Sequence, residues 1–316
     1  MNLYIVIPCF NEEAVLPQTL RRMNHLVEQL RKDADLDASL LFVDDGSTDQ
    51  TWALVQQAAA AHRHIEGIRL SRNVGHQNAL WAGMETVSGK CDCMVSIDAD
   101  LQDDETAIVE MVHKWREGSD IVYGVRSERK ADTWLKRTTA QLFYRMMQLM
   151  DTRTVYNHAD FRLLSARALD ALLHYDERNL FLRSMVRQLG FNESVVYYTR
   201  QERAAGTSKY PLRRMLQFSL DGITSFSSAP LQWITVLGLC MTVVSLVMIV
   251  WALVRYCMGV TIQGWTSLLV SLWFIGGVVT TGIGITGIYV GKIYTEVKHR
   301  PRYFVAEKTA SAGKSE

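Results

Sequence analysis

Two long runs without a charged residue, close to the C-terminal end, constrain the fold of this chain more than any other feature. Trp233 to Val254 covers 22 residues, and Trp265 to Val290 is a second such run. As a helix, the first run would be about 33 Å long, which is enough to cross the hydrocarbon layer of a bilayer. Soluble proteins seldom contain two such segments. The sequence therefore predicts two transmembrane helices.

Positive charge lies outside this pair of runs rather than between them. The connection holds only Arg255, whereas the flanks carry Arg203, Lys209, Arg213 and Arg214 before the pair and Lys292, Lys298, Arg300 and Arg302 after it. By the positive-inside rule, both flanks and the N-terminal region are expected in the cytoplasm. Residues 209–230 favour an amphipathic helix at the membrane interface, although a helix packed in a soluble core has similar periodicity. We expect the small, polar tail after Phe304 to be disordered.

The first 125 residues alternate between strand and helix patterns, with short connections. Apolar runs at residues 3–7, 40–43, 65–70, 94–97 and 120–125 predict strands, and the segments between them have helical spacing. This order is typical of an α/β domain with a mostly parallel, doubly wound sheet. No G-x-G-x-x-G fingerprint follows the first predicted strand, and the sequence has no Walker loop, which argues against dinucleotide oxidoreductases and P-loop NTPases.

Composition excludes some classes of function. The net charge of +1 gives no general field for binding nucleic acid. The five cysteines are scattered and odd in number, as expected for a protein of a reducing compartment without a disulfide framework. The first residues run directly into a strand pattern, without the basic start and cleavage site of a signal peptide.

Polar side chains follow the predicted strands at the points where the strands end. They are Asn11, Asp44, Asp45, Asn73, Asp98, Asp100 and Arg126. The carboxyl ends of parallel strands lie at one edge of a sheet, where open α/β folds bind ligands. We therefore expect these residues to form one site.

The stretch from Asp98 to Gln102 is the candidate metal site of this edge. Two carboxylates, Asp98 and Asp100, stand one residue apart after an apolar strand, and Gln102 adds an amide oxygen. Oxygen ligands of this kind suit Mg²⁺ or Mn²⁺, which in turn suit a substrate with phosphate groups. The D-x-D spacing alone is weak support, because Asp33, Asp35 and Asp37 repeat it.

Taken together, these segments resemble the family 2 glycosyltransferases of the GT-A fold, and within them the polyprenyl-phosphate hexose transferases. The matching segments are residues 7–12 (IPCFNE), 44–49 (DDGSTD), 72–75 (RNVG), 98–102 (DADLQ), 160–162 (DFR) and 203 with 208–210. The two terminal runs and the tail at 293–302 resemble the bacterial, bactoprenol-glucosylating subgroup.

The resemblance implies four parts and a bacterial inner-membrane location. Residues 1–208 would be a cytoplasmic GT-A domain, 209–230 an interfacial amphipathic helix region, 231–292 two transmembrane helices with a short outside loop, and 293–316 a cytoplasmic basic tail. The protein would be multi-pass, with both termini in the cytoplasm.

The resemblance also assigns roles to residues. The nucleotide sugar would be bound by Pro8, Phe10, Glu12, Val43, Asp45, Asp98, Ala99, Arg126, Arg203 and Lys209. The metal ligands would be Asp98, Asp100 and Gln102, and the catalytic carboxylates Asp160 and Asp100. The acceptor phosphate would be held by Arg162, Arg203, Lys209 and Arg213.

Some of these assignments depart from the family or stay open. Phe10 replaces the tyrosine that is usual in the family, which keeps stacking but removes a hydroxyl. His76 is interpreted as a residue of the helix surface. Asp160 is either a base or an orienting group, and the alternative is that it is a carboxylate paired with Arg162 in a loop.

The implied reaction is transfer of glucose from UDP-glucose to polyprenyl (undecaprenyl) phosphate. The product would be a lipid-linked sugar for cell-envelope or O-antigen (lipopolysaccharide) modification, passed to a downstream flippase and glycosyltransferase. A GDP-sugar, mannose, galactose, an N-acetylhexosamine or an aminoarabinose derivative stays open, and a catalytically inactive membrane scaffold is the alternative from another class. A homo-oligomer is also left open, since the second run offers a packing face: Gly276, Gly277, Gly282, Gly284 and Gly287.

Overall fold

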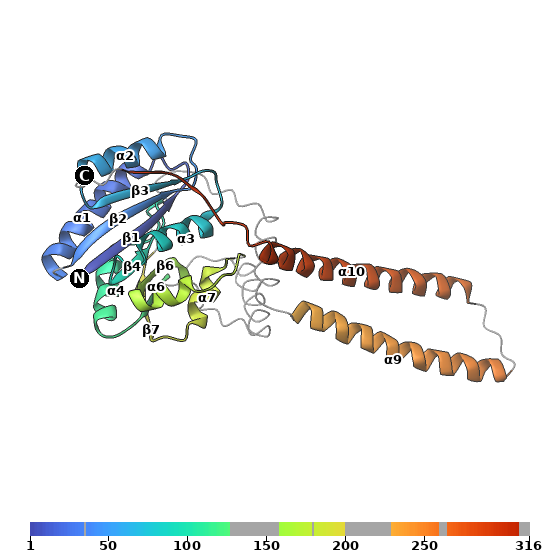
Figure 1. Cartoon of the computed structure of the whole chain (residues 1–316). Helices are drawn as coiled ribbons and strands as arrows, with labels where there is room; N and C mark the ends of the chain where they lie inside the picture. Colours follow the sequence, from blue (N-terminus) through green and yellow to red (C-terminus); the bar gives the residue numbers. More distant parts are fainter. Residues whose placement is uncertain (35, 127–157, 179, 200–228, 259–263, 310–316) are drawn as a thin grey trace. The chain divides into compact units, whose positions relative to one another are not determined.

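The computed structural model describes residues 1–34, 36–126, 158–178, 180–199, 229–258 and 264–309 (Figure 1). The chain divides into two compact units. The first contains Met1–Arg145, Arg153–Tyr210 and Arg300–Glu316, and the second contains Met146–Thr152 and Pro211–His299. Most of the expected interfacial segment, with Arg213, lies outside the described residues, as do Arg203 and Lys209.

The first unit is built on one eight-stranded sheet in the order β7-β5-β6-β4-β1-β2-β3-β8. Its strands are β1 (Asn2–Cys9), β2 (Asp37–Asp44), β3 (Ile65–Leu70), β4 (Cys93–Ser96), β5 (Ile121–Arg126), β6 (His158–Ser165), β7 (Glu193–Tyr198) and β8 (Val305–Lys308). β4, β1, β2 and β3 are parallel neighbours, and β7 is parallel to β5. β6 is antiparallel to both β4 and β5. The expected α/β class with a mostly parallel sheet is confirmed, and the five strands expected from the sequence correspond to β1–β5.

Helices cover both faces of this sheet (Figure 1). They are α1 (Leu16–Ala34), α2 (Thr51–Ala61), α3 (His76–Val87), α4 (Ala107–Arg116), α6 (Ala166–Leu173) and α7 (Leu182–Gln188). β1 shows why both faces need a cover: Leu3, Ile5 and Ile7 share a core with residues of α1, α2 and α4. The alternate residue Val6 faces α3, where a Cβ atom on Gly83 would lie 2.3 Å from its Cγ1. A continuous apolar run is therefore the expected pattern for this strand.

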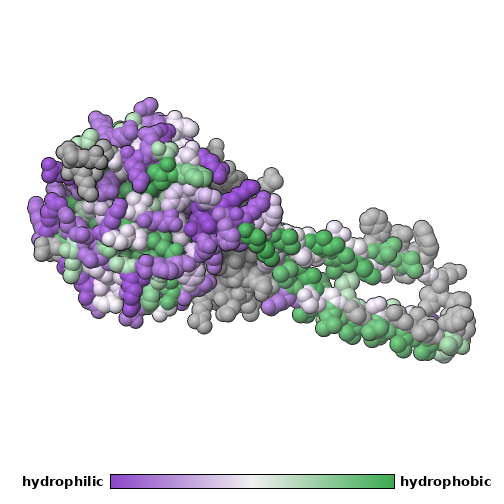
Figure 2. Space-filling model, in the orientation of Figure 1, coloured by the Kyte–Doolittle hydropathy of each residue, from purple (hydrophilic) through white to green (hydrophobic). Residues whose placement is uncertain are grey.

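The second unit contains two long apolar helices, α9 (Ala229–Cys257) and α10 (Trp265–Val297). Both are long and apolar enough to cross a membrane, with mean hydropathy of 2.0 over Leu231–Met248 and 1.5 over Phe274–Val297. Figure 2 shows their apolar side chains on the molecular surface, and the two windows are 0% buried within the structure. The two helices expected from the sequence are thus confirmed as helices.

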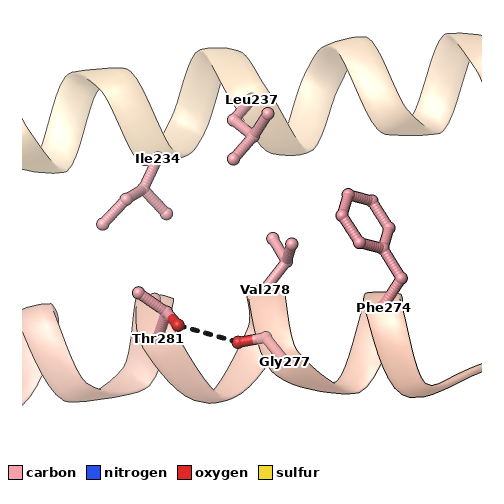
Figure 3. Close-up of a pocket in the computed structure, with 7 residues that line it drawn as sticks. Ile234, Leu237, Phe274, Gly277, Val278 and Thr281 are labelled. Atoms are coloured by element: carbon pink, nitrogen blue, oxygen red, sulfur yellow. Dashed lines mark hydrogen bonds between the residues drawn. The ribbon is translucent and has the colours of Figure 1, made fainter.

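An apolar pocket of about 420 Å³ lies between α9 and α10 (Figure 3). Its lining residues are Ile234, Leu237, Phe274, Gly277, Val278, Thr281 and Gly282. The hydroxyl of Thr281 donates a hydrogen bond to the carbonyl of Gly277 at 2.8 Å. Because this hydroxyl is satisfied inside its own helix, the pocket stays apolar although it contains a threonine.

The prediction of a disordered tail after Phe304 is wrong for the residues that follow directly. Val305–Lys308 form β8, which pairs antiparallel with β3. The pairing is extended by hydrogen bonds from the Ser71 amide to the Phe304 carbonyl and from the Thr309 amide to the Gly67 carbonyl, both 2.9 Å. The side chains of β8 are exposed at the sheet edge, so the strand has no apolar alternation that the sequence could reveal.

Candidate active site

The ends of β1, β2 and β4 meet at one edge of the sheet, as expected from the sequence. Cys9 at the end of β1 is in register with Asp44 at the end of β2, and the Asp45 amide donates to the Cys9 carbonyl at 2.9 Å. On the other side of β1, the Ile97 amide donates to the Val6 carbonyl at 3.1 Å. The loops that carry Phe10, Asp45 and Asp98 therefore start next to one another.

A tight turn after β2 is tied to the loop after β1. The Ser47 amide donates to Asp44 Oδ1 at 3.2 Å, and Gly46 has a φ of 71°. A Cβ atom on Gly46 would lie 2.6 Å from the carbonyl carbon of Arg72, so only glycine fits. Asn11 binds the turn from the other side: its amide donates to Ser47 Oγ, and its side-chain oxygen accepts from the Thr48 amide, both at 2.9 Å.

Asp45 organises the next loop. Its two carboxylate oxygens accept from the amides of Val74 and Gly75 at 2.8 and 3.0 Å, immediately before α3 begins at His76. Burial raises the pKa of Asp45, and these two amides oppose the rise. The expected nucleotide-binding residue is thus a buried carboxylate that fixes the backbone of the 72–75 segment.

The other residues expected around the nucleotide differ in accessibility. Phe10 is exposed, and Glu12 is half-buried, with its amide donating to Thr51 Oγ1 at 2.9 Å. Pro8 and Val43 are buried in the strands beneath. Ala99 is buried as well, and its carbonyl accepts from Thr19 Oγ1 at 2.8 Å.

Asp98 and Asp100 stand in a crowded acidic loop. The side chain of Asp98 is 37% exposed. Burial raises the pKa of Asp98 to about 6; His76 opposes the rise, and the carboxylates at positions 103, 160 and 100 add to it. Asp100 Oδ1 accepts from the amide of Gln102, a buried residue, at 3.2 Å. Between them Leu101 has a φ of 57°, a strained conformation for a residue with a branched side chain.

The acidic loop fits a divalent cation that is shared with a substrate. Within the described ranges, no group of three or more His, Cys, Asp or Glu side chains is placed to hold a metal by itself. Mg²⁺ commonly binds to one or two carboxylates and completes its shell with substrate phosphates and water. Burial is the main cause of the raised pKa of Asp98, and the neighbouring carboxylates add to it; a cation bound at Asp98 and Asp100 would relieve this like-charge repulsion.

Asp160 lies in β6 beside this loop, and three side chains bind its carboxylate. Arg162 Nη2 donates to Oδ1 at 2.5 Å, and Arg183 donates from Nε to Oδ1 and from Nη2 to Oδ2, both at 3.3 Å. Gln77 Nε2 donates to Oδ2, also at 3.3 Å. Burial alone would raise the pKa of Asp160, but Arg183 and Arg162 hold it well below its usual range. The pairing with Arg162 is present, but in a strand rather than a loop.

The structure corrects the assignment of Arg162 to the acceptor phosphate. Its side chain is 0% exposed, with Nη1 donating to the Leu182 carbonyl at 3.1 Å and Nη2 to Asp160. A guanidinium enclosed in this way has no surface for a ligand. Arg162 is instead the buried ion-pair partner of Asp160.

Two residues that the sequence reading missed lie at the surface of the same site. Arg183, at the start of α7, is 35% exposed on the outer side of Asp160. His76 was interpreted as helix surface, but its Nε2 lies 3.5 Å from Asp98 Oδ1 and 3.7 Å from Asp160 Oδ2. The position of His76 directly after the 72–75 segment was an available signal, whereas no motif marked Arg183.

Arg126 reaches the site from the end of β5, as expected. Its Nε donates to the Tyr198 hydroxyl at 3.1 Å, and its Nη2 donates to Asp103 Oδ1 at 3.2 Å. The Tyr198 hydroxyl in turn donates to Asp103 Oδ1 at 2.5 Å. These contacts fix the guanidinium beside the acidic loop, with Asp103 as its counter-charge.

Comparison with known proteins agrees with this architecture. The family model described as Glycosyl transferase family 2 matches residues 4–173, which is more than half of the chain. This chain belongs to glycosyltransferase family 2.

Similar proteins extend the likeness to nearly the whole chain. A protein named uncharacterized glycosyltransferase YkoT, from Bacillus subtilis (strain 168), is 48% identical over 305 residues, covering 96% of this chain and 90% of the relative. The bactoprenol glucosyl transferase of Shigella phage SfV is 36% identical over 307 residues, covering 96% and 98%. The protein of the same name from Shigella phage SfX is 36% identical over 310 residues, covering 98% and 100%.

Proposed function

We propose that this protein is a membrane glycosyltransferase that moves glucose from UDP-glucose to a polyprenyl phosphate. The observation that carries the proposal is the meeting of Asp45, Asp98 and Asp160 at one sheet edge, each from a different strand end. The likeness to proteins named bactoprenol glucosyl transferase over almost the full chain supports glucose and the lipid acceptor. The proposed product is a lipid-linked sugar for cell-envelope modification, which a flippase and a second transferase would use.

The donor would bind along the ends of β1, β2 and β4. Phe10 is exposed next to the Asp45 loop and offers a ring on which a base can stack. The diphosphate would lie at Asp98 and Asp100 with a shared Mg²⁺ or Mn²⁺, and Arg126 would face it from β5. When bound, the cation supplies charge stabilisation for the nucleoside diphosphate that leaves. The side chains of this edge bind and orient the donor so that this charge develops beside cationic groups.

The acceptor would approach Asp160. A phosphate monoester with a second pKa of about 6 is largely ionised at neutral pH, so its oxygen attacks the sugar without a strong base. Asp160 has a pKa below its usual range and is therefore a weak proton acceptor. We propose that Asp160 orients the reactants, and that Arg183 contacts the acceptor phosphate in place of Arg162, together with Arg203, Lys209 and Arg213.

The lipid acceptor requires a membrane location. We propose that α9 and α10 span the bacterial inner membrane and that residues 209–230 lie at its interface. The basic residues on both flanks support a cytoplasmic position for the catalytic unit and both termini. A sugar nucleotide made in the cytosol and a phosphate headgroup at the inner leaflet would then meet on the same side.

A direct test is a donor screen on purified protein with a short-chain polyprenyl phosphate. We expect UDP-glucose to give a lipid-linked product, while UDP-galactose, UDP-N-acetylglucosamine and GDP-mannose give much less. Asp100→Ala should abolish transfer, because the shared cation loses a ligand. Asp37→Ala is the matched control, since this carboxylate is exposed at the start of β2, far along the chain from the acidic loop.

Two results would contradict the proposal. If another sugar nucleotide gave a higher rate of transfer than UDP-glucose, the proposal of glucose as the transferred sugar would be wrong. A folded protein without turnover, whose melting temperature does not rise with UDP and Mn²⁺, would favour the inactive scaffold, because a ligand that binds the folded state raises its stability.

A further inference from the structure

β8, the last strand among the described residues, contacts elements of the proposed donor side. Glu307 of β8 accepts hydrogen bonds at both carboxylate oxygens: Oε2 from Trp52 Nε1 at 2.9 Å and Oε1 from Arg69 Nη1 at 3.1 Å. These partners are more than 230 residues away in the sequence, on α2 and β3. The tail thus contacts elements that precede α9 and α10 in the sequence.

Arg69 passes this contact on to the turn after β2. Its Nη2 donates to the Ser47 carbonyl at 3.2 Å, and its Nε lies 3.4 Å from Asp44 Oδ2. Among the described residues, Asp44 Oδ2 is buried without a hydrogen bond, so the charge of Arg69 is the compensation that it has. A planar guanidinium that touches Glu307, Ser47 and Asp44 at once is held in one orientation.

The turn held by Arg69 is the one that carries Asp45. Asp45 binds the amides of Val74 and Gly75, which lead directly into α3. A series of contacts therefore runs from Glu307 through Arg69 and the Asp44–Ser47 turn to the loop before His76. The side chain of Glu307 is 46% exposed, and ion pairs as exposed as this one contribute little to the free energy of unfolding. The consequence of the Glu307–Arg69 contact is therefore the position of the Arg69 side chain.

The same tail also holds the far end of α3. The guanidinium of Arg302 lies 4.4 Å from the centroid of the Trp81 ring, and its Nη2 donates to the carbonyls of Tyr175 and Glu177 at 3.1 and 2.8 Å. Trp81 Nε1 donates to Glu85 Oε1 at 2.7 Å, and the Tyr303 hydroxyl donates to the same carboxylate. Asp45 fixes the start of α3, and the tail fixes its later turns.

We infer that the tail segment Arg302–Glu307 supports the donor site, and that Glu307 is a positioning residue that sets the affinity for the nucleoside diphosphate. Glu307 acts through Arg69, which shapes the Asp44–Ser47 turn, and it does not touch the substrate itself. The inference rests on the proposed function, because the ligand at this edge is taken to be UDP-glucose.

The test uses the full chain with Glu307→Gln. This change keeps the size of the side chain and its acceptor for Trp52, but removes the charge that faces Arg69. We expect the Kd of UDP and the KM of UDP-glucose to rise about three- to ten-fold, within the usual coupling of contacting residues. kcat and the KM of the lipid acceptor should change less than about two-fold. Lys308→Gln is the matched control on the same strand, and its values should equal those of the wild type.

A second substitution separates positioning from general loss of structure. Arg69→Gln should weaken UDP binding at least as much as Glu307→Gln, because it also removes the contacts with Ser47 and Asp44. The double variant should be no weaker than Arg69→Gln alone, because both changes break one series of contacts. Additive losses in the double variant would overturn the inference. So would a folded Glu307→Gln protein that binds UDP as tightly as the wild type. If the wild type itself does not bind UDP, the donor assignment fails and the inference fails with it, which is a different result from an unchanged variant.

Discussion

Two of the buried carboxylates of the site, Asp45 and Asp160, are stabilised by different means. Asp45, after β2, is bound by two backbone amides, and burial leaves its pKa raised. Asp160, in β6, is bound by Arg162, Arg183 and Gln77, and the two arginines hold its pKa below the usual range. The proposed donor side thus holds its carboxylate with backbone amides, and the proposed acceptor side holds its carboxylate with charged side chains.

The largest expected effect is on the free energy of unfolding, and it comes from removing the buried arginine that pairs with Asp160. Arg162→Met should lower the free energy of unfolding by about 3–5 kcal/mol, because it removes the buried cation that is paired with the buried carboxylate of Asp160. Arg183→Met, which removes a partly exposed arginine from the same carboxylate, should cost about 1 kcal/mol or less. Urea denaturation of both variants measures the difference. Equal losses would show that the buried and the exposed arginine are equivalent.

A smaller effect is expected from replacing each carboxylate by its amide, and UDP binding and turnover should respond differently in the two variants. Asp45→Asn leaves one of the two backbone amides without an acceptor, which costs about 1–3 kcal/mol, and UDP binding should weaken as the 72–75 segment loosens. Asp160→Asn should abolish most of the turnover but leave the Kd of UDP near that of the wild type. Isothermal titration with UDP and Mn²⁺ measures both. Loss of UDP binding in Asp160→Asn would contradict the division into donor and acceptor sides.

The smallest expected effect is on the pH dependence of stability, where the two carboxylates have opposite signs. The lowered pKa of Asp160 gives stability that is present above the unfolded value of about 3.9 and is lost as the pH falls below it. The raised pKa of Asp45 means that stability falls as the pH rises from about 4 through its folded pKa. Unfolding free energies of wild type, Asp45→Asn and Asp160→Asn between pH 3.5 and 7 check this. Relative to the wild type, Asp45→Asn should gain with rising pH and Asp160→Asn should lose.

The parallel half of the sheet was predictable from the sequence because local patterns define it. Continuous apolar runs marked β1–β4, and the residues directly after them, such as Asp45 and Asp98, were correctly expected at one edge. The position of Asp160 had no such local signal. It joins this edge because β6 inserts antiparallel between β4 and β5, a pairing set by distant parts of the chain.

The error on Arg162 has a simple geometric cause. Asp160 and Arg162 are two residues apart in a strand, so their side chains point to the same face of the sheet. Here the arginine side chain is fully buried, while the half-exposed position beside Asp160 is taken by Arg183, from a helix that begins 22 residues after Asp160. The spacing in the sequence predicts that Asp160 and Arg162 share one face of the sheet, but it does not predict how deeply each side chain is buried.

The pairing of β8 with β3 also fixes the order in which the catalytic unit can be completed during synthesis. The ribosome makes β8 last, after α9 and α10, so the outer edge of β3 stays open until both apolar helices have emerged. An open edge can pair with a second chain and aggregate. In the proposed membrane arrangement, completion of the sheet with β8 would therefore follow insertion of α9 and α10, and a chain that has not yet placed β8 would expose the β3 edge to aggregation.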